Sequence, residues 1–155
     1  MADFNAVLGQ AAAIASVAYP GARLGEITFR PKDQSANQAE DMTTWNFVFS
    51  IPRNRVTISL QEGQFNTPQL LEGGLISDRL FSPPLNKSLG DAFAILRQGG
   101  YGDPVTKIKL RQVLDFAPSV PQEPCYFMEL ANDNADVISV GASSGQLRVV
   151  VLPPD

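Results

Sequence analysis

Residues 44–61 read TWNFVFSIPRNRVTISLQ and carry the clearest structural signal in the chain. Large apolar residues alternate here with smaller or polar ones, which is the period-two pattern of a half-buried strand. The apolar positions of the first run are Trp45, Phe47, Phe49 and Ile51. A turn at residues 52–54 separates this run from a second alternating run at residues 56–61, so the sequence predicts an antiparallel hairpin.

An amphipathic helix and a further strand precede the hairpin. Asp3 is a suitable N-cap, and apolar residues recur after it at helical spacing. Residues 19–21, Tyr-Pro-Gly, end the helix because proline restricts the residue before it and glycine permits the turn. Residues 23–30 then alternate as a strand, with Ile27 and Phe29 on one face.

Two segments lack a clear period. Residues 31–42 are mostly polar, and we expect them to form a long mobile loop. Residues 67–87 mix apolar residues with prolines and a glycine pair. We expect this second segment to be a connector that packs on the body of the protein and holds one short extended piece.

The same kinds of element return after the connector. Ser88 and Asp91 have the spacing of a capping box and open a second helix, which ends at a glycine pair, residues 99–100. Four alternating runs predict the remaining strands. They lie at residues 105–113, 126–130, 137–140 and 147–152.

Five residues of the first half have identical residues at one constant offset in the second half. Leu8, Ala11, Ala13, Ile14 and Ile27 correspond to Leu89, Ala92, Ala94, Ile95 and Ile108. Either a helix-and-strand unit occurs twice, or two helices of similar composition align by chance. From the first alternative we predict an α+β fold of two similar halves, each with its helix packed on one face of a three- to four-stranded antiparallel sheet.

The predicted units are a first repeat at residues 1–66, the connector at 67–87 and a second repeat at 88–155, with a single joint domain as the alternative. The second repeat resembles the PepSY-like and, more broadly, the cystatin-like pattern over residues 88–150. The resemblance rests on a helix, a Gly-Gly break, two strands and the run VISVGASSGQL at residues 137–147. Gly141-Ala142 stands where that pattern has Val-Asp. The resemblance implies a fold and a binding or inhibitory role, without an active site.

Composition excludes several classes of function. The formal net charge of −4 argues against nucleic-acid binding, which needs clustered Lys and Arg. No run approaches the roughly 18 apolar residues of a membrane span. The N-terminal run starts with Asp3 and has no Lys or Arg before Arg23, unlike a secretory signal, so we expect a cytoplasmic protein.

The residue types give no basis for a catalytic, metal or cofactor site. The chain has no His, the commonest general base, and a single cysteine, Cys125, which is interpreted as a core or edge residue; the alternative is a reactive thiol. Asp133 and Asp136 lie in an Asn-rich stretch that lacks the Gly and distal Glu of a calcium loop, so a turn is expected there. We therefore predict no enzyme activity, no metal and no cofactor.

Two features are candidate binding sites. Lys107, Lys109 and Arg111 project from one face of a predicted strand. They form either the solvated face of a sheet or a docking surface for an acidic protein partner. Trp45 is in phase with the core of its strand, and the alternative is that it anchors an interface.

The sequence supports two function hypotheses. The first is a non-catalytic protein-binding module, such as an inhibitor, an immunity-type protein or a small component of an assembly, that binds another protein through an exposed sheet face. The alternative is a module that binds a small apolar ligand, for which a lined cavity of several hundred cubic ångströms would be the sign. Partner and oligomeric state are not specified by the sequence.

Overall fold

The computed structural model of the chain describes residues 3–73, 79–113, 122–134 and 136–150. Two α-helices and a short 3-10 helix, η1, accompany nine strands in these residues. The elements are α1 Phe4–Ala18, β1 Arg23–Pro31, η1 Ala39–Asp41, β2 Met42–Ile51, β3 Asn54–Gln61, β4 Gln64–Phe65, β5 Gln69–Glu72, α2 Leu89–Gln98, β6 Val105–Arg111, β7 Cys125–Leu130, β8 Val137–Gly141 and β9 Leu147–Val150.

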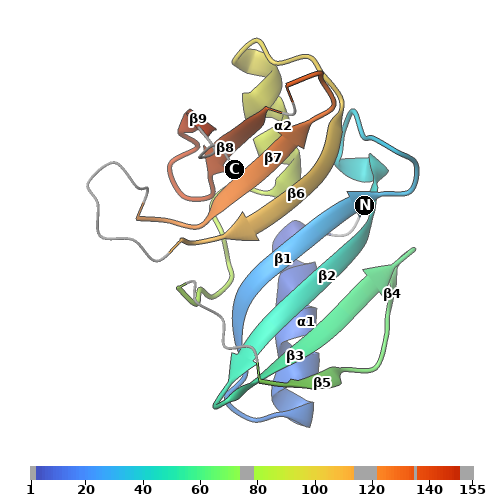
Figure 1. The fold of residues 1–155 in the computed structure, drawn as a ribbon. Helices are drawn as coiled ribbons and strands as arrows, with labels where there is room; N and C mark the ends of the chain where they lie inside the picture. The colour runs from blue at the N-terminus through green and yellow to red at the C-terminus, as the bar shows by residue number, and fades with distance from the viewer. Residues whose placement is uncertain (1–2, 74–78, 114–121, 135, 151–155) are drawn as a thin grey trace.

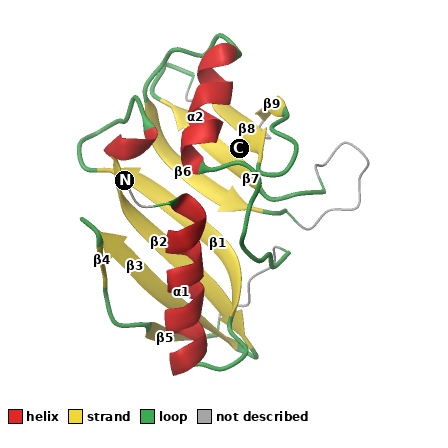
Figure 2. Cartoon of the chain, turned by 180° about the vertical axis from the view of Figure 1, so that it is seen from behind, coloured by secondary structure: helices red, strands yellow, loops and turns green. Residues whose placement is uncertain are grey.

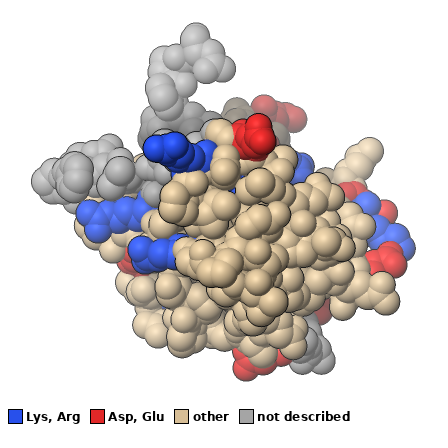
Figure 3. Space-filling model, turned by 90° about the horizontal axis from the view of Figure 1, so that it is seen from below, with Lys and Arg blue, Asp and Glu red and all other residues tan. Residues whose placement is uncertain are grey.

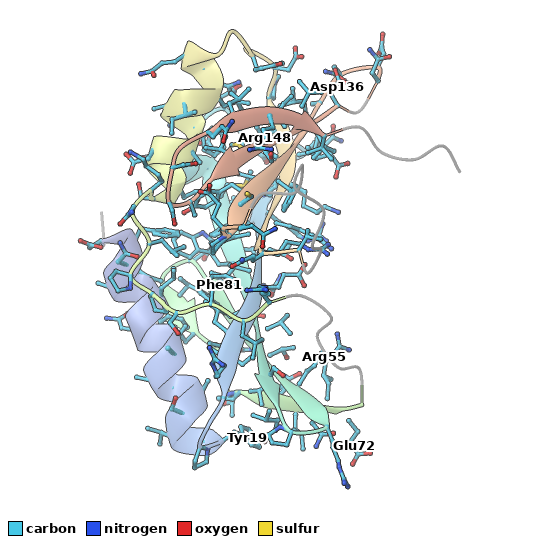
Figure 4. The ribbon with its side chains drawn as sticks, turned by 90° about the vertical axis from the view of Figure 1, so that its left-hand side faces the viewer. Tyr19, Arg55, Glu72, Phe81, Asp136 and Arg148 are labelled. Carbon is cyan, nitrogen blue, oxygen red and sulfur yellow. The ribbon has the colours of Figure 1, made fainter. Side chains whose placement is uncertain are left out.

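The strands form one continuous antiparallel sheet in the order β4-β3-β2-β1-β6-β7-β8-β9, with β5 pairing beside β4 on β3 (Figure 1). Both helices lie on the same face of this sheet (Figure 2). Figure 4 shows the sheet edge-on, with the helices on one side and Arg55 on the other.

The prediction of an α+β fold with two helix-plus-sheet halves is wrong, because the strands of both parts belong to a single nine-stranded sheet. The join is the β1–β6 pair, in which Ile27 lies opposite Leu110 and Phe29 opposite Ile108. Pairing these two strands satisfies the backbone groups that each would otherwise leave open at a sheet edge. The alternation of apolar and polar residues along a strand indicates which side of the strand is buried, but it does not indicate which strand pairs with it.

The predicted strands are found with small changes at their ends. The hairpin of residues 44–61 is β2 and β3, and Phe47, Phe49, Val56 and Ile58 are buried on its helix-facing side. Residues 151–152 of the last predicted strand lie outside the described residues. In the predicted connector, residues 69–72 form the short extended piece, β5, at the edge of the sheet. The division of the chain into units at residues 1–66, 67–87 and 88–155 stays a prediction.

Both helix starts have the caps that the sequence predicts. The Asp3 carboxylate accepts hydrogen bonds from the backbone N–H groups of Asn5 (2.8 Å) and Ala6 (3.2 Å). Ser88 and Asp91 form a full capping box, with each side chain accepting from the backbone N–H of the other residue. These caps satisfy N–H groups that have no partner within a helix. Neither helix in the described part of the chain is long and apolar enough to cross a membrane.

The segment at residues 31–42, predicted to be a mobile loop, is tied to the second half of the sheet. Ala36 is fully buried and exchanges two backbone hydrogen bonds of 2.8 Å with Val105 at the start of β6. The Arg97 guanidinium donates to the carbonyl oxygen of Asn37 (3.1 Å) and to those of Tyr101 (2.9 Å) and Asp103 (2.7 Å). One side chain of α2 therefore fixes two loops in place.

Glu123 closes the turn between β8 and β9. Its carboxylate accepts hydrogen bonds from the N–H groups of Ser143 (2.9 Å) and Ser144 (2.8 Å) and from the Ser144 hydroxyl (2.8 Å). A Cβ atom on Gly141 would collide with this carboxylate, which explains a glycine at that position. Burial raises the pKa of Glu123, but the hydrogen bonds from Ser144 and Ser143 and the charge of Arg148 lower it by more.

Replacing Glu123 by glutamine should lower the free energy of unfolding at neutral pH by about 1 kcal/mol, because charged acceptors form stronger hydrogen bonds and partial exposure reduces the effect. The folded-state pKa of Glu123 lies below its usual value of 4.5, so its stabilisation is present above that pH and is lost as the pH falls through the folded pKa. Urea unfolding at neutral pH and at about pH 3 measures this difference between wild type and variant.

The matched control is Glu72→Gln, which changes an exposed carboxylate in edge strand β5 and should have little effect at either pH. A Glu123→Gln effect of the same size at both pH values would contradict the assignment.

Candidate functional site

A cleft of about 640 Å³ lies where the two helices begin, above the ends of β2, β3 and β4. The starts of α1 and α2 meet near the middle of the helix-covered face (Figure 2). Six large apolar side chains line its interior. They are Phe4, Met42, Trp45, Leu60, Phe65 and Leu89. We call this the helix-end cleft.

Two hydrogen bonds hold the start of α1 against the segment that leads into α2. The Asn5 side-chain amide donates to the carbonyl oxygen of Leu85 (2.9 Å) and accepts from the Leu85 N–H (2.8 Å). Leu85 is buried, and Asn86, Ser88 and the first residues of α2 follow it along the wall of the cleft. This pairing brings residues eighty positions apart in sequence to one site.

The segment before α2 is also fixed from the sheet. The hydroxyl of fully buried Tyr126 in β7 donates to the carbonyl oxygen of Lys87 (2.6 Å), and the Lys87 N–H donates to the Ala142 carbonyl oxygen (2.8 Å). Burial raises the pKa of Tyr126, so its hydroxyl stays a donor across the ordinary pH range. The wall of the cleft is therefore preformed.

Trp45 is the aromatic centre of the cleft. It is half-buried in β2, and its ring packs against Phe4 (5.7 Å between centroids) and edge-on against Phe29 (5.0 Å). Its indole N–H donates to the carbonyl oxygen of Met42 at 2.8 Å. Because this one polar group is already satisfied, Trp45 presents only apolar aromatic surface to the cleft. The structure thus places Trp45 against the core and also in the lining.

Three carboxylates lie among the lining residues, and the described lining includes no Lys or Arg. Asp3 caps α1, Asp91 belongs to the capping box of α2, and Glu62 lies in the turn between β3 and β4. The hydrogen bonds of the helix caps use one oxygen of Asp3 (Oδ1) and one of Asp91 (Oδ2). The second oxygen of each has no hydrogen bond to the described residues.

The predicted basic strip lies on the opposite face of the sheet from the cleft. Lys107 forms an ion pair with Glu129 of β7 (3.7 Å), and Lys109 forms one with Glu26 of β1 (3.4 Å). Arg111 is partly buried opposite Glu26 and Cys125. The charges of Lys107 and Lys109 are thus partly balanced within the sheet, and a role of the strip in docking an acidic partner stays a prediction.

The remaining candidate residues have structural roles. Cys125 is a buried free thiol at the start of β7, and desolvation together with the charge of Glu123 raises its pKa to about 12, so the thiol form is favoured over a reactive thiolate. The Asn132 side chain bonds both the backbone and the carboxylate of Asp136, as expected for a turn. Within the described residues, no group of three or more Cys, Asp or Glu side chains could hold a metal ion.

Sequence patterns did not reveal the cleft, although Trp45 drew attention as a possible anchor outside the core. Phe65 lies in a two-residue strand that is too short to show a period, and Leu89 is only the first residue of its helix. The lining comes from the ends of elements that meet in space. Hydrophobic periodicity predicts the middle of a helix or strand, but it does not predict which ends of different elements lie together in the fold.

Comparison with known proteins supports the fold but gives no family. No family model matches the chain, and no curated protein matches it either. A solved structure described as a "putative lipoprotein" from Clostridium difficile 630 is similar, with a TM-score of 0.62 over 92% of this chain and 90% of that chain. The sequence identity is 14%, so the similarity concerns the fold alone. The resemblance to the PepSY and cystatin patterns finds no support in these comparisons.

Proposed function

We propose that the protein is a non-catalytic binding module that holds a small apolar ligand in the helix-end cleft. The observation that carries the proposal is the cleft itself, whose volume of about 640 Å³ is within the range of small-molecule sites. Its interior is formed by Trp45, Phe4, Phe65 and aliphatic side chains, and burying such surface against an apolar ligand is favourable.

The way in which the cleft is built also supports the proposal. Its wall is fixed by the Asn5–Leu85 hydrogen bonds and by the Tyr126 hydroxyl, so a ligand would not have to order the site on binding. A preformed site loses less conformational entropy when it is filled. Three polar residues of the lining, Asp3, Ser88 and Asp91, form the helix caps, and the cap hydrogen bonds hold their side chains in place.

The experiment uses N-phenyl-1-naphthylamine, a neutral apolar dye whose emission rises in an apolar site. Energy transfer from Trp45, the single tryptophan of the chain, reports whether the dye sits in the cleft. Gly90→Phe should weaken dye binding at least tenfold, because Gly90 lines the cleft and an added Cβ would meet only the Ser88 hydroxyl, at 3.7 Å. The bulky ring would then occupy the space of the ligand.

Gly9→Phe is the matched control. Gly9 is an exposed glycine of α1 with no atom within 4 Å of an added Cβ, and it is not part of the cleft lining. Both changes replace a helical glycine by a better helix former, so neither should unfold the protein. Dye binding that is absent in the folded wild type, or that is equal in the two variants, would refute the proposal.

The second candidate function is protein binding, favoured by the surface of α1. This helix has no charged residue from Phe4 to Ala18, and Val17 is 86% exposed. Leu70 and Leu71 of β5 are also exposed, at 41% and 40%. Seen from the end at which α1 finishes, the molecule has a broad uncharged surface (Figure 3). Exposed apolar patches of this kind often mark contacts with another protein.

The occupant that this surface suits best is a second copy of the chain, because two uncharged helix faces can meet without burying an unpaired charge. Sedimentation velocity should then show concentration-dependent dimers, and Val17→Lys should weaken the dimer at least tenfold. Gln98→Lys, which places the same charge in the exposed last turn of α2, is the control and should change nothing. A wild-type protein that stays monomeric at all concentrations would refute this candidate.

A further inference from the structure

We infer that the ligand of the helix-end cleft carries a positive charge next to its apolar group, as an alkyl or aromatic ammonium compound does. The inference rests on the proposed function, because it concerns the ligand of the same cleft. What carries it is one lining that combines partly buried aromatic side chains with three exposed carboxylates, those of Asp3, Glu62 and Asp91, which therefore lie at the edge of the cleft.

The charge balance at the cleft is negative. The three carboxylates contribute a formal charge of about −3, and the start of each helix contributes roughly +0.5 from its aligned peptide dipoles. The two helix starts therefore offset only about one of the three charges. The described lining holds no Lys or Arg to offset the rest. An anionic ligand would be repelled, and a neutral one would gain no attraction of opposite charges from the edge.

The neighbouring lysine does not reverse this balance. Lys87 lies in sequence between the lining residues Asn86 and Ser88, but its side chain extends to Gly145, where its Cε would lie 3.2 Å from an added Cβ. Gly145 is in the turn between β8 and β9, away from the cleft lining. The positive charge of Lys87 is thus directed toward the β8–β9 turn.

The carboxylates also keep oxygen atoms available for a ligand. The helix caps use Asp3 Oδ1 and Asp91 Oδ2, which leaves Asp3 Oδ2 and Asp91 Oδ1 without a hydrogen bond to the described residues. Glu62 is exposed and held in a left-handed turn with φ of 50°, so its position is set by the β3–β4 turn. A cationic group at the edge, with or without an N–H donor, could place its positive charge beside such oxygens while the apolar part of the ligand lies inside.

The interior suits a cation as well. Trp45 and Phe4 are adjacent rings in the lining, with centroids 5.7 Å apart. The faces of aromatic rings attract cations, and tryptophan does so most strongly. Carboxylates at the edge and aromatic rings inside therefore favour the same sign of ligand charge.

The experiment compares three probes of equal chain length below their micelle concentrations: octyltrimethylammonium, 1-octanol and octanoate. Each is measured by displacement of N-phenyl-1-naphthylamine at low salt. We expect octyltrimethylammonium to bind tightest and octanoate weakest, and added salt should reduce the difference, because exposed charges are screened.

A triple variant without the three edge carboxylates combines Asp3→Asn, Glu62→Gln and Asp91→Asn. Asparagine at position 3 still caps α1, and the amide oxygen of asparagine at position 91 can still accept from the Ser88 N–H, so these hydrogen bonds are kept while the charges are removed. Exposed ion pairs are each worth about fivefold in affinity or less, so the three together should weaken octyltrimethylammonium binding about tenfold. The affinity for 1-octanol should not change.

The control variant combines Asp33→Asn, Glu72→Gln and Asp133→Asn, three exposed carboxylates outside the lining that change the net charge by the same amount. Equal loss of octyltrimethylammonium binding in both triple variants would assign the attraction to net charge and overturn the inference. Binding of 1-octanol as tight as that of the ammonium probe would also overturn it while leaving the proposed function intact. Failure of every probe to bind the folded wild type would overturn the proposed function itself.

Discussion

The pairing of β1 with β6 is the contact on which the rest of the molecule depends. Four residue pairs join the strands, and Ile27, Phe29, Ile108 and Leu110 from this join are all fully buried. Without it, the strands would form two small sheets, each covered by one helix. With it, both helices lie on one surface and share one core, and their first turns come close enough to enclose the cleft.

Polar contacts at the helix starts then determine the shape of the cleft. The Asn5 side chain bonds the backbone of Leu85 through both its amide nitrogen and its amide oxygen. The Tyr126 hydroxyl, from the sheet, bonds the carbonyl oxygen of Lys87 in the same segment. Each contact satisfies backbone groups that would otherwise be buried without a partner. The apolar residues of the lining could not form a stable hollow alone, because unsupported side chains would collapse into the space.

Much of the local structure could be predicted from the sequence, because it depends on neighbours along the chain. The alternation around Phe47 and Phe49 defines β2, and the Ser88–Asp91 spacing defines the start of α2. Long-range pairing could not be predicted in this way: nothing in the sequence near Ile27 names Leu110 as its neighbour, and Ala36 gives no sign of its bonds to Val105. The cleft depends on such pairings, and for this reason Trp45 alone among its residues was considered as a candidate binding residue.

The two hydrogen bonds between the Asn5 side chain and the Leu85 backbone have a thermodynamic consequence. Residues of α1, of β2 and β3 and of α2 meet at the cleft only in the folded chain, where the Asn5–Leu85 hydrogen bonds form, so the unfolded chain has no comparable site. A molecule that occupies the cleft therefore binds the native state alone, and by mass action it raises the melting temperature of the whole protein in proportion to the logarithm of its concentration. Occupation of this small site would in this way stabilise all nine strands of the sheet at once.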